Sequence, residues 1–175
     1  SPVMTPKLRE EMGKAAVTAA KAVNYSNAGT VEFMIDGDLN YYFMEMNTRL
    51  QVEHPITEMI TGIDLAKYQL RIASGEKLKI KQSDIIQRGH ALECRIYAED
   101  PLNGFLPSIG NLKKIQVPTG PNIRNDTGIY AGMKVTSYYD PMLAKLATYA
   151  ENREENINKM IWALSRYAIM GVTTN

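Results

Sequence analysis

Ten residues, EMNTRLQVEH at positions 45–54, place a polar or charged group at every second position. The alternating members are Glu45, Asn47, Arg49, Gln51 and Glu53, and mostly apolar residues lie between them. Successive side chains of an extended backbone point to opposite faces, so this pattern predicts a strand with one polar and one apolar face. We interpret the polar face as the chemical centre of the chain, suited to holding a divalent metal, phosphate and a small anion together.

The region just before this segment predicts a β-hairpin. Strand-like runs at 30–35 and 39–46 flank Asp36-Gly37-Asp38, a typical hairpin turn sequence. If Gly37 and Asp38 form a two-residue loop, Glu32 lies opposite Phe43, and Glu45 lies one diagonal step away on the same face. Two carboxylates then converge on one face.

The converging acids suggest a metal site. Mg²⁺ prefers oxygen ligands, commonly one or two carboxylates together with substrate phosphates and water. Glu32, Glu45 and Asn47 supply such a set. The alternative is that these three residues occupy only the solvated face of an antiparallel hairpin.

The residues after Asn47 favour the site. Eight extended steps from Glu45 to Glu53 would span about 26 Å at roughly 3.3 Å per residue, which is too far for one small reaction centre. The chain must therefore bend after Asn47 and curl around an anion. Arg49 offers a forked cation, and Glu53 can accept a proton. Gln51 and the backbone N–H of Val52 add neutral hydrogen bonds.

Periodicity and capping residues predict the remaining elements, which together give an α+β fold. The expected helices span about 6–23, 55–60 and 64–74, with a last helix that begins after Asn152, ends near Gly171 and turns Ile157, Met160, Ile161 and Leu164 toward the core. The expected strands span 88–98, 112–117, 122–125 and 145–149, and a loop covers 100–110. In the 88–98 strand, Leu92, Cys94 and Ile96 share one face, and Glu93, Arg95 and Tyr97 the other.

Composition excludes several classes of protein. With 45% hydrophobic residues, the 175-residue chain can bury a core, and its formal net charge of +1 gives no field that favours nucleic acid or an anionic membrane. No apolar run approaches the roughly 18 residues that span a bilayer. Cys94 is the single cysteine, which excludes an internal disulfide and leads us to expect a cytoplasmic location.

Several continuous motifs carry a resemblance to a known family. The runs EMNTRLQVEHPITEMITGIDL, RGHALECRIYAEDP, FLPS and YYDPMLAKL are similar to those of biotin carboxylase, the ATP-grasp component of biotin-dependent carboxylases. The similarity runs from SPVMTP to GVTTN and so covers the whole chain. It implies the end of an ATP-grasp domain at residues 1–78, followed at 79–175 by an incomplete biotin carboxylase C-terminal domain (a rudiment hybrid motif), which is mainly antiparallel β with helices.

The resemblance also implies a role for each site residue. Glu32 and Glu45 would bind two Mg²⁺ or Mn²⁺ ions that bridge the ATP phosphates, with Asn47 in the same shell, and Met34 would contact adenine. Arg49, Gln51 and the Val52 backbone would hold bicarbonate, and Glu53 would deprotonate it to form carboxyphosphate. Arg95 would stabilise the enolate-like oxygen of biotin. Asp140 matches an acid of the active-site region whose role stays open, and Arg124 matches a position at the family's dimer interface.

By the same resemblance, the expected partners are ATP, bicarbonate, a biotin carboxyl carrier, a carboxyltransferase component and a second copy of the chain; fatty acid biosynthesis is one process it suggests. We expect the 175 residues alone to be inactive. The sequence does not indicate whether the acceptor is acetyl-CoA, propionyl-CoA or pyruvate. Two alternatives remain: another ATP-grasp ligase, such as a carbamoyl-phosphate-forming enzyme, and a non-catalytic docking or dimerisation module.

Overall fold

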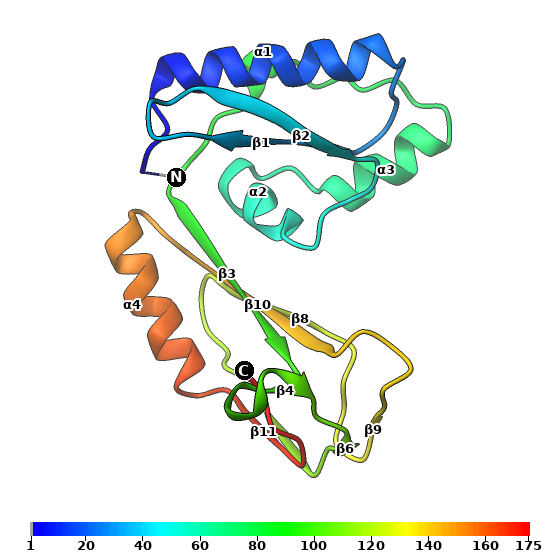
Figure 1. The fold of residues 1–175 in the computed structure, drawn as a ribbon, viewed down its shortest axis with the longest axis vertical. Helices are drawn as coiled ribbons and strands as arrows, with labels where there is room; N and C mark the ends of the chain where they lie inside the picture. The colour runs from blue at the N-terminus through cyan, green and yellow to red at the C-terminus, as the bar shows by residue number, and fades with distance from the viewer. Residues whose placement is uncertain (1) are drawn as a thin grey trace. The chain divides into compact units, whose positions relative to one another are not determined.

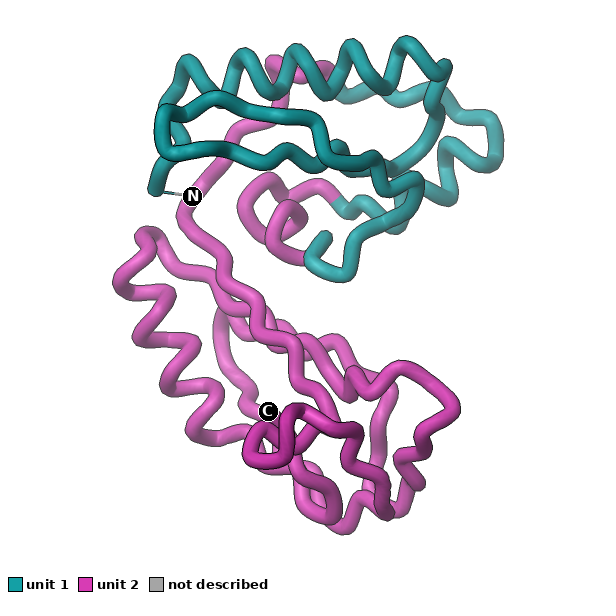
Figure 2. The backbone as a smooth tube through the Cα atoms, viewed as in Figure 1, with its two compact units in different colours: residues 1–54, 64–80 teal, residues 55–63, 81–175 magenta. Residues whose placement is uncertain are grey.

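The computed structural model describes residues 2–175 (Figure 1). The chain divides into two units, residues 1–54 with 64–80 and residues 55–63 with 81–175 (Figure 2). The division is therefore not a single cut, because the short segment 55–63 groups with the second unit. Within the described residues, no helix is long and apolar enough to cross a bilayer.

The first unit opens with helix α1 (Pro6–Ala22), which begins where its capping sequence predicts. The Thr5 side chain accepts a hydrogen bond from the Leu8 N–H at 3.1 Å, and Pro6 occupies the first turn, where its missing N–H costs nothing. Leu8 is buried, whereas Val23, the last residue of the predicted helix, lies beyond α1 and is exposed. The predicted helix is confirmed except at this last residue.

The hairpin consists of β1 (Thr30–Ile35) and β2 (Tyr41–Asn47), but its loop is longer than predicted. The Asp36 N–H donates to the Asn40 carbonyl at 3.0 Å, and Leu39 adopts a left-handed φ of 65°. The Asp36 carboxylate also accepts hydrogen bonds from the Asp38 and Asn40 N–H groups at 3.0 and 2.8 Å. These bonds stabilise a wider turn, so the predicted two-residue loop is wrong.

The register of the hairpin also differs from the predicted one. Phe33 pairs with Phe43, but Glu32 pairs directly with Glu45, because Met44 forms a β-bulge on β2. Without the extra residue, Glu32 would lie opposite Met44, and Glu45 would point to the other face. The predicted pairing of Glu32 with Phe43 is wrong, whereas the convergence of the two glutamates is confirmed, and the bulge produces it.

Two helices follow the hairpin, α2 (His54–Thr61) and α3 (Leu65–Ala73). Pro55 is buried in the first turn of α2. The Asp64 side chain caps α3 by accepting a hydrogen bond from the Lys67 N–H at 2.8 Å. Gly75 follows α3 with a φ of 91°, a conformation that glycine adopts without steric cost, so α3 ends within a residue of its predicted end at 74.

The second unit is built on an antiparallel sheet in the order β3-β10-β8. These strands are β3 (His90–Tyr97), β10 (Met142–Ala150) and β8 (Ile123–Thr127). Helix α4 (Arg153–Leu164) packs on the sheet, and Ile96, Leu146 and Met160 form the core between them. Leu92 and Cys94 contact the same cluster, so the predicted alternation of β3 is confirmed.

Smaller antiparallel pairs extend this unit around a second core of Ala98, Leu112, Val135 and Leu143. Part of the predicted loop at 100–110 is thus ordered as a short strand pair and a 3₁₀ turn. The pairs are β4 (Glu99–Asp100) with β5 (Leu106–Pro107), β6 (Gly110–Asn111) with β9 (Lys134–Val135), and β7 (Lys114–Gln116) with β11 (Ala168–Met170); the 3₁₀ turns are η1 (Gln82–Asp84) and η2 (Pro101–Asn103).

Helix α4 is shorter and rotated relative to the prediction. It ends at Leu164 rather than near Gly171, because β11 follows and pairs with β7. The predicted inward residues Ile161 and Leu164 are 61% and 38% exposed. Asn156 and Ala163 are buried instead, along with the predicted Met160.

A buried hydrogen-bond network accounts for this rotation. Asn156 and Thr148 are both fully buried. The Thr148 hydroxyl donates to Asn156 Oδ1 at 2.7 Å, and Asn156 Nδ2 donates to the His90 carbonyl at 2.9 Å. The network ties α4 to β10 and β3 and satisfies polar groups that would be costly to bury alone.

We expect Asn156→Ala to lower the free energy of unfolding by about 2–3 kcal/mol, because the buried Thr148 hydroxyl loses its acceptor. Asn158→Ala is the matched control, since Asn158 lies exposed on the same helix. Urea denaturation of the purified chain measures both values. Equal effects of the two substitutions would contradict the inferred role of the network.

An ion cluster joins β8 to α2 inside the second unit. Arg124 donates to Asp126 through two hydrogen bonds of 2.8 Å each, and to Glu58 Oε2 at 2.6 Å. Burial alone raises the pKa of the Asp126 carboxyl, but the hydrogen bonds and charge of Arg124, assisted by Lys145 at 3.6 Å, outweigh burial. The pKa of Asp126 therefore lies below its ordinary value of 3.8.

This lowered pKa predicts a loss of stability in acid. A carboxyl with a depressed pKa in the folded state contributes stability above its unfolded-state pKa, and this contribution disappears as the pH falls through the folded-state value. The affected range therefore begins near pH 4 and extends downward. We expect Asp126→Asn to be less stable than the parent at pH 7 and to lose less stability below pH 4. Parallel denaturation curves at pH 7, 4 and 3 measure this, and identical pH dependence would contradict it.

Candidate functional site

The site begins at the carboxyl end of β2, where one amide lies between two acids. Asn47 Nδ2 donates to Glu32 Oε1 at 2.6 Å and to Glu45 Oε1 at 3.1 Å. Like charges directly opposite each other in a sheet repel, and an N–H donor between them reduces that repulsion. The two carboxylates are therefore held on one face of the hairpin, within reach of the same amide group.

The chain leaves the extended conformation after Asn47, where the distance argument placed a bend. Arg49 then folds back onto its neighbours: Nη1 donates to Gln51 Oε1 at 2.8 Å, and Nη2 donates to Asn47 Oδ1 at 3.2 Å. Gln51 Nε2 reaches Glu32 Oε1 at 3.4 Å. Glu32, Asn47, Arg49 and Gln51 thus form a closed ring of side-chain hydrogen bonds, with Glu45 attached through Asn47. We call these five residues the acid–arginine ring.

The turn that follows the acid–arginine ring carries Val52 and Glu53. The His54 N–H donates to the Gln51 carbonyl at 3.2 Å, and His54 Nδ1 lies 2.8 Å from the same oxygen. These contacts fix the turn. Glu53 is exposed directly before α2, and Val52 is half-buried.

Met34 lies on the same strand and the same face as Glu32 of the acid–arginine ring. It lies two residues after Glu32 on β1, so both side chains project from the same face. Its side chain is 60% exposed, which leaves surface for a flat apolar ligand. The expected adenine contact stays a prediction.

Gly29 supports the acid–arginine ring, and sequence analysis did not single it out. A Cβ atom added at Gly29 would lie 3.2 Å from the Asn47 carbonyl oxygen and 2.8 Å from Tyr25 Cε1. Tyr25 is itself fixed, because its hydroxyl donates to the Ala28 carbonyl at 2.6 Å. The loop therefore needs glycine to approach the end of β2, a requirement visible only in the folded chain.

Arg95 and Asp140 belong to the second unit. Arg95 is exposed on β3, on the face opposite the core residues Cys94 and Ile96, and is paired in register with Lys145. Asp140 Oδ1 accepts a hydrogen bond from the Met142 N–H at 2.8 Å and so helps to start β10. Burial, followed by the charge of Glu93, raises the pKa of the Cys94 thiol, which makes it a weaker nucleophile than an exposed cysteine.

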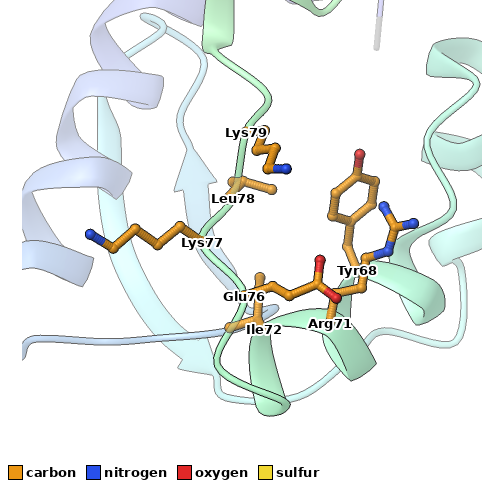
Figure 3. Close-up of a pocket in the computed structure, with 7 residues that line it drawn as sticks. All are labelled: Tyr68, Arg71, Ile72, Glu76, Lys77, Leu78 and Lys79. Carbon is orange, nitrogen blue, oxygen red and sulfur yellow. The ribbon is translucent and has the colours of Figure 1, made fainter.

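A small cavity of about 140 Å³ lies elsewhere in the first unit (Figure 3). It is bordered by the side of α3 and by the segment that follows it, and Lys77 points away from Tyr68 in this view. None of the predicted site residues borders it, so it does not contribute to the acid–arginine ring. Its lining residues are Tyr68, Arg71, Ile72, Glu76, Lys77, Leu78 and Lys79.

The donor set limits which metal the acid–arginine ring could hold. Among residues 2–175, no group of three or more His, Cys, Asp or Glu side chains could form a metal cage. Two carboxylates and an amide are instead the partial set that Mg²⁺ or Mn²⁺ uses when phosphate and water complete the shell. Glu32, Glu45 and Asn47 therefore fit a metal that arrives with a phosphorylated ligand.

Comparison with known proteins decides the family. Residues 1–81 match the family model "Carbamoyl-phosphate synthase L chain, ATP binding domain", and residues 93–175 match "Biotin carboxylase C-terminal domain". The chain belongs to the biotin carboxylase family. It is 54% identical to the biotin carboxylase of Halalkalibacterium halodurans, over 100% of the chain and 38% of that protein. It is also 51% identical to biotin carboxylase 1 of Bacillus subtilis, over 99% of the chain and 39% of that protein.

A solved structure supports the same family assignment. The biotin carboxylase domain dimer of Hydrogenobacter thermophilus 2-oxoglutarate carboxylase, in complex with MgADP, ADP and bicarbonate, superposes with a TM-score of 0.95 at 50% identity. The match covers 98% of this chain and 38% of that one. The chain thus spans slightly less than two fifths of the length of these relatives. The predicted α+β class, an ATP-grasp part followed by a biotin carboxylase C-terminal domain, is confirmed.

We expect Gly29→Ala to destabilise the first unit by about 1–3 kcal/mol, because the added methyl group presses on Tyr25 and on the end of β2. Gly13→Ala is the matched control. Gly13 lies inside α1 with no atom near the added methyl group, so alanine there should stabilise by about 0.5–1 kcal/mol. Urea denaturation of both variants measures the difference, and effects of the same sign would contradict this account.

Proposed function

We propose that this chain is the part of a biotin carboxylase that supplies the metal, bicarbonate and biotin groups for the ATP-dependent carboxylation of biotin. The observation that carries the proposal is the acid–arginine ring, in which two carboxylates and a guanidinium are joined through Asn47 and Gln51. It provides one anionic and one cationic recognition surface within a single hydrogen-bonded group. A nucleotide-bound cation and a small oxyanion are ligands of complementary charge.

Glu32 and Glu45 are proposed to hold Mg²⁺ or Mn²⁺ on the ATP phosphates. Asn47 Nδ2 occupies the position between the carboxylates, and a cation there would replace its N–H groups. The amide can then turn its oxygen toward the metal, which makes Asn47 a third ligand. When bound, the metal ions neutralise charge on the phosphates and orient them for transfer. The MgADP bound to the Hydrogenobacter thermophilus domain supports this role.

Arg49 and Gln51 are proposed to hold bicarbonate together with the Val52 N–H. The guanidinium of Arg49 is already fixed by Gln51 and Asn47, so less conformational entropy is lost when an anion binds. Glu53 follows within the same turn and is proposed to remove the bicarbonate proton. The resulting carbonate oxygen attacks the γ-phosphorus of ATP, which releases ADP and forms carboxyphosphate.

Arg95 is proposed to act in the second half of the reaction. Carboxyphosphate breaks down to CO₂ and phosphate, and the phosphate removes the ureido proton of biotin. Negative charge then develops on the ureido oxygen before the nitrogen attacks CO₂. The exposed guanidinium of Arg95 on β3 would stabilise that oxygen by charge placed where it develops.

The proposed partners follow from the reaction and the relatives. They are ATP, bicarbonate and biotin on a carrier protein or domain, with a carboxyltransferase component that consumes carboxybiotin, and we propose a cytoplasmic location. Relatives of similar identity bear the names of propionyl-CoA, methylcrotonoyl-CoA and pyruvate carboxylases, so the acceptor stays open. The Hydrogenobacter thermophilus domain is described as a dimer, and we propose a homodimer for the whole enzyme.

We further propose that the 175 residues alone do not turn over ATP. The acid–arginine ring carries one cation against two carboxylates, too little positive charge to hold a triphosphate without further donors. The chain also spans less than two fifths of the relatives described above. Bicarbonate-dependent ATP hydrolysis by the purified chain would contradict this.

Two other functions are less well supported. A carbamoyl-phosphate-forming ligase would share the first 81 residues, but the match of residues 93–175 to the biotin carboxylase C-terminal domain favours biotin. A docking or dimerisation module would not need an ordered acid–arginine ring. Both alternatives predict that Arg95 has no role in a carboxylation of biotin.

The test uses the full-length enzyme that contains this segment. We expect Glu53→Gln to reduce both bicarbonate-dependent ATP hydrolysis and free-biotin carboxylation by about 10²–10⁴-fold, the usual effect of losing a general base. Arg95→Ala should reduce biotin carboxylation by about 10²-fold or more while ATP hydrolysis continues. Arg9→Ala, an exposed position on α1, is the control and should change neither rate. Unchanged carboxylation in Arg95→Ala would contradict the proposal.

A further inference from the structure

Strand β3, which carries Arg95, lies at the edge of its sheet. The strand order is β3-β10-β8, so β10 pairs with only one side of β3. The backbone groups on the other side need partners outside this sheet. The Arg95 carbonyl and the Tyr97 N–H point to that open side, where both form hydrogen bonds with Asn175.

The pairing with β10 is irregular beside Arg95. Tyr97 pairs with Met142 and Ile96 pairs with Ala144, so Leu143 is an extra residue on β10. Such an irregularity interrupts the ladder of hydrogen bonds and bends the strand. The backbone at Arg95 thus needs support from its other edge more than a regular strand would.

Asn175 provides that support through three hydrogen bonds. Its Nδ2 donates to the Arg95 carbonyl at 3.1 Å, its Oδ1 accepts from the Tyr97 N–H at 2.9 Å, and its backbone N–H donates to the Tyr97 carbonyl at 3.3 Å. A carboxamide is planar and carries an N–H donor and a C=O acceptor, as a peptide group does. The Asn175 side chain therefore bridges Arg95 and Tyr97 as the peptide of a neighbouring strand would.

The segment that carries Asn175 is itself anchored to the second unit. The Thr173 N–H donates to the Ser108 hydroxyl at 2.9 Å, and Val172 contacts the second core cluster. At Gly171 the backbone has a φ of 115° and runs so close to the Asn111 carbonyl that a Cβ atom would meet it. These contacts hold Asn175 in place from several directions.

From these contacts we propose that Asn175 is a positioning residue for Arg95: its carboxamide fixes the edge of β3 so that the guanidinium is presented correctly to biotin. The inference rests on the proposed role of Arg95. Asn175 touches no substrate in this account and acts only through the backbone of β3. Misplacing a catalytic group by about 1 Å can reduce a rate by about 10²-fold.

The test compares two reactions of the full-length enzyme. We expect Asn175→Ala to reduce the kcat of free-biotin carboxylation by about 10–100-fold, while bicarbonate-dependent ATP hydrolysis without biotin stays within about twofold of the parent. Asn175→Asp should give a similar loss, because it has the same shape but lacks the donor to the Arg95 carbonyl. Thr173→Ala is the matched control, since its backbone bond to Ser108 remains.

A double variant shows whether Asn175 acts through Arg95. In an Arg95→Ala background, Asn175→Ala should reduce carboxylation by no more than about twofold further, because residues that act as one unit are not additive. Losses that multiply would overturn the inference. A proportional fall of carboxylation and ATP hydrolysis in Asn175→Ala would also overturn it, because a general loss of folded enzyme has that effect.

The remaining outcomes separate the inference from the function on which it rests. Normal carboxylation in Asn175→Ala, together with loss in Arg95→Ala, would refute the role of Asn175 and leave the proposed function standing. Normal carboxylation in Arg95→Ala would refute the proposed function, and the role of Asn175 would fall with it.

Discussion

The first unit depends on one electrostatic arrangement, the contact of the Asn47 amide with the carboxylates of Glu32 and Glu45. Two acids paired across a hairpin are unfavourable by themselves, and the amide, fixed in turn by Arg49, makes the pairing tolerable. The same arrangement keeps the carboxylates at a separation that a cation can bridge. Neutral and cationic hydrogen-bond donors of the chain thereby hold the two carboxylates in the arrangement that the proposed metal site requires.

A backbone irregularity lies in each of the two proposed reactive regions. In the first unit, the bulge at Met44 turns Glu45 onto the face of Glu32. In the second, Leu143 is an extra residue on β10, and it interrupts the register with β3 next to Arg95. A regular β2 would place Glu45 on the face opposite Glu32, so the first arrangement would not arise.

Sequence reasoning succeeded where the information is local. The start of α1, the end of α3 before Gly75 and the alternation of β3 each depend on a few neighbouring residues, and each is confirmed. The convergence of Glu32 and Glu45 was also predicted, although by a register that proved wrong. The longer loop and the bulge at Met44 each shift the pairing by one residue. Together the two shifts return the Glu45 side chain to the face of the hairpin that carries Glu32.

What the sequence did not reveal depends on contacts between distant segments. Asn156 faces inward because it hydrogen-bonds to Thr148 and to the His90 carbonyl in the core. Hydrophobic periodicity alone predicts that Ile161 faces inward instead, whereas Ile161 is exposed. Asn175 lies 80 residues after Arg95 in the sequence, so no window of local pattern could have linked the two. In both cases an asparagine carboxamide completes a strand edge or a buried network. The structure therefore adds most to the sequence motifs of this family where a polar side chain takes the place of a backbone hydrogen-bond partner.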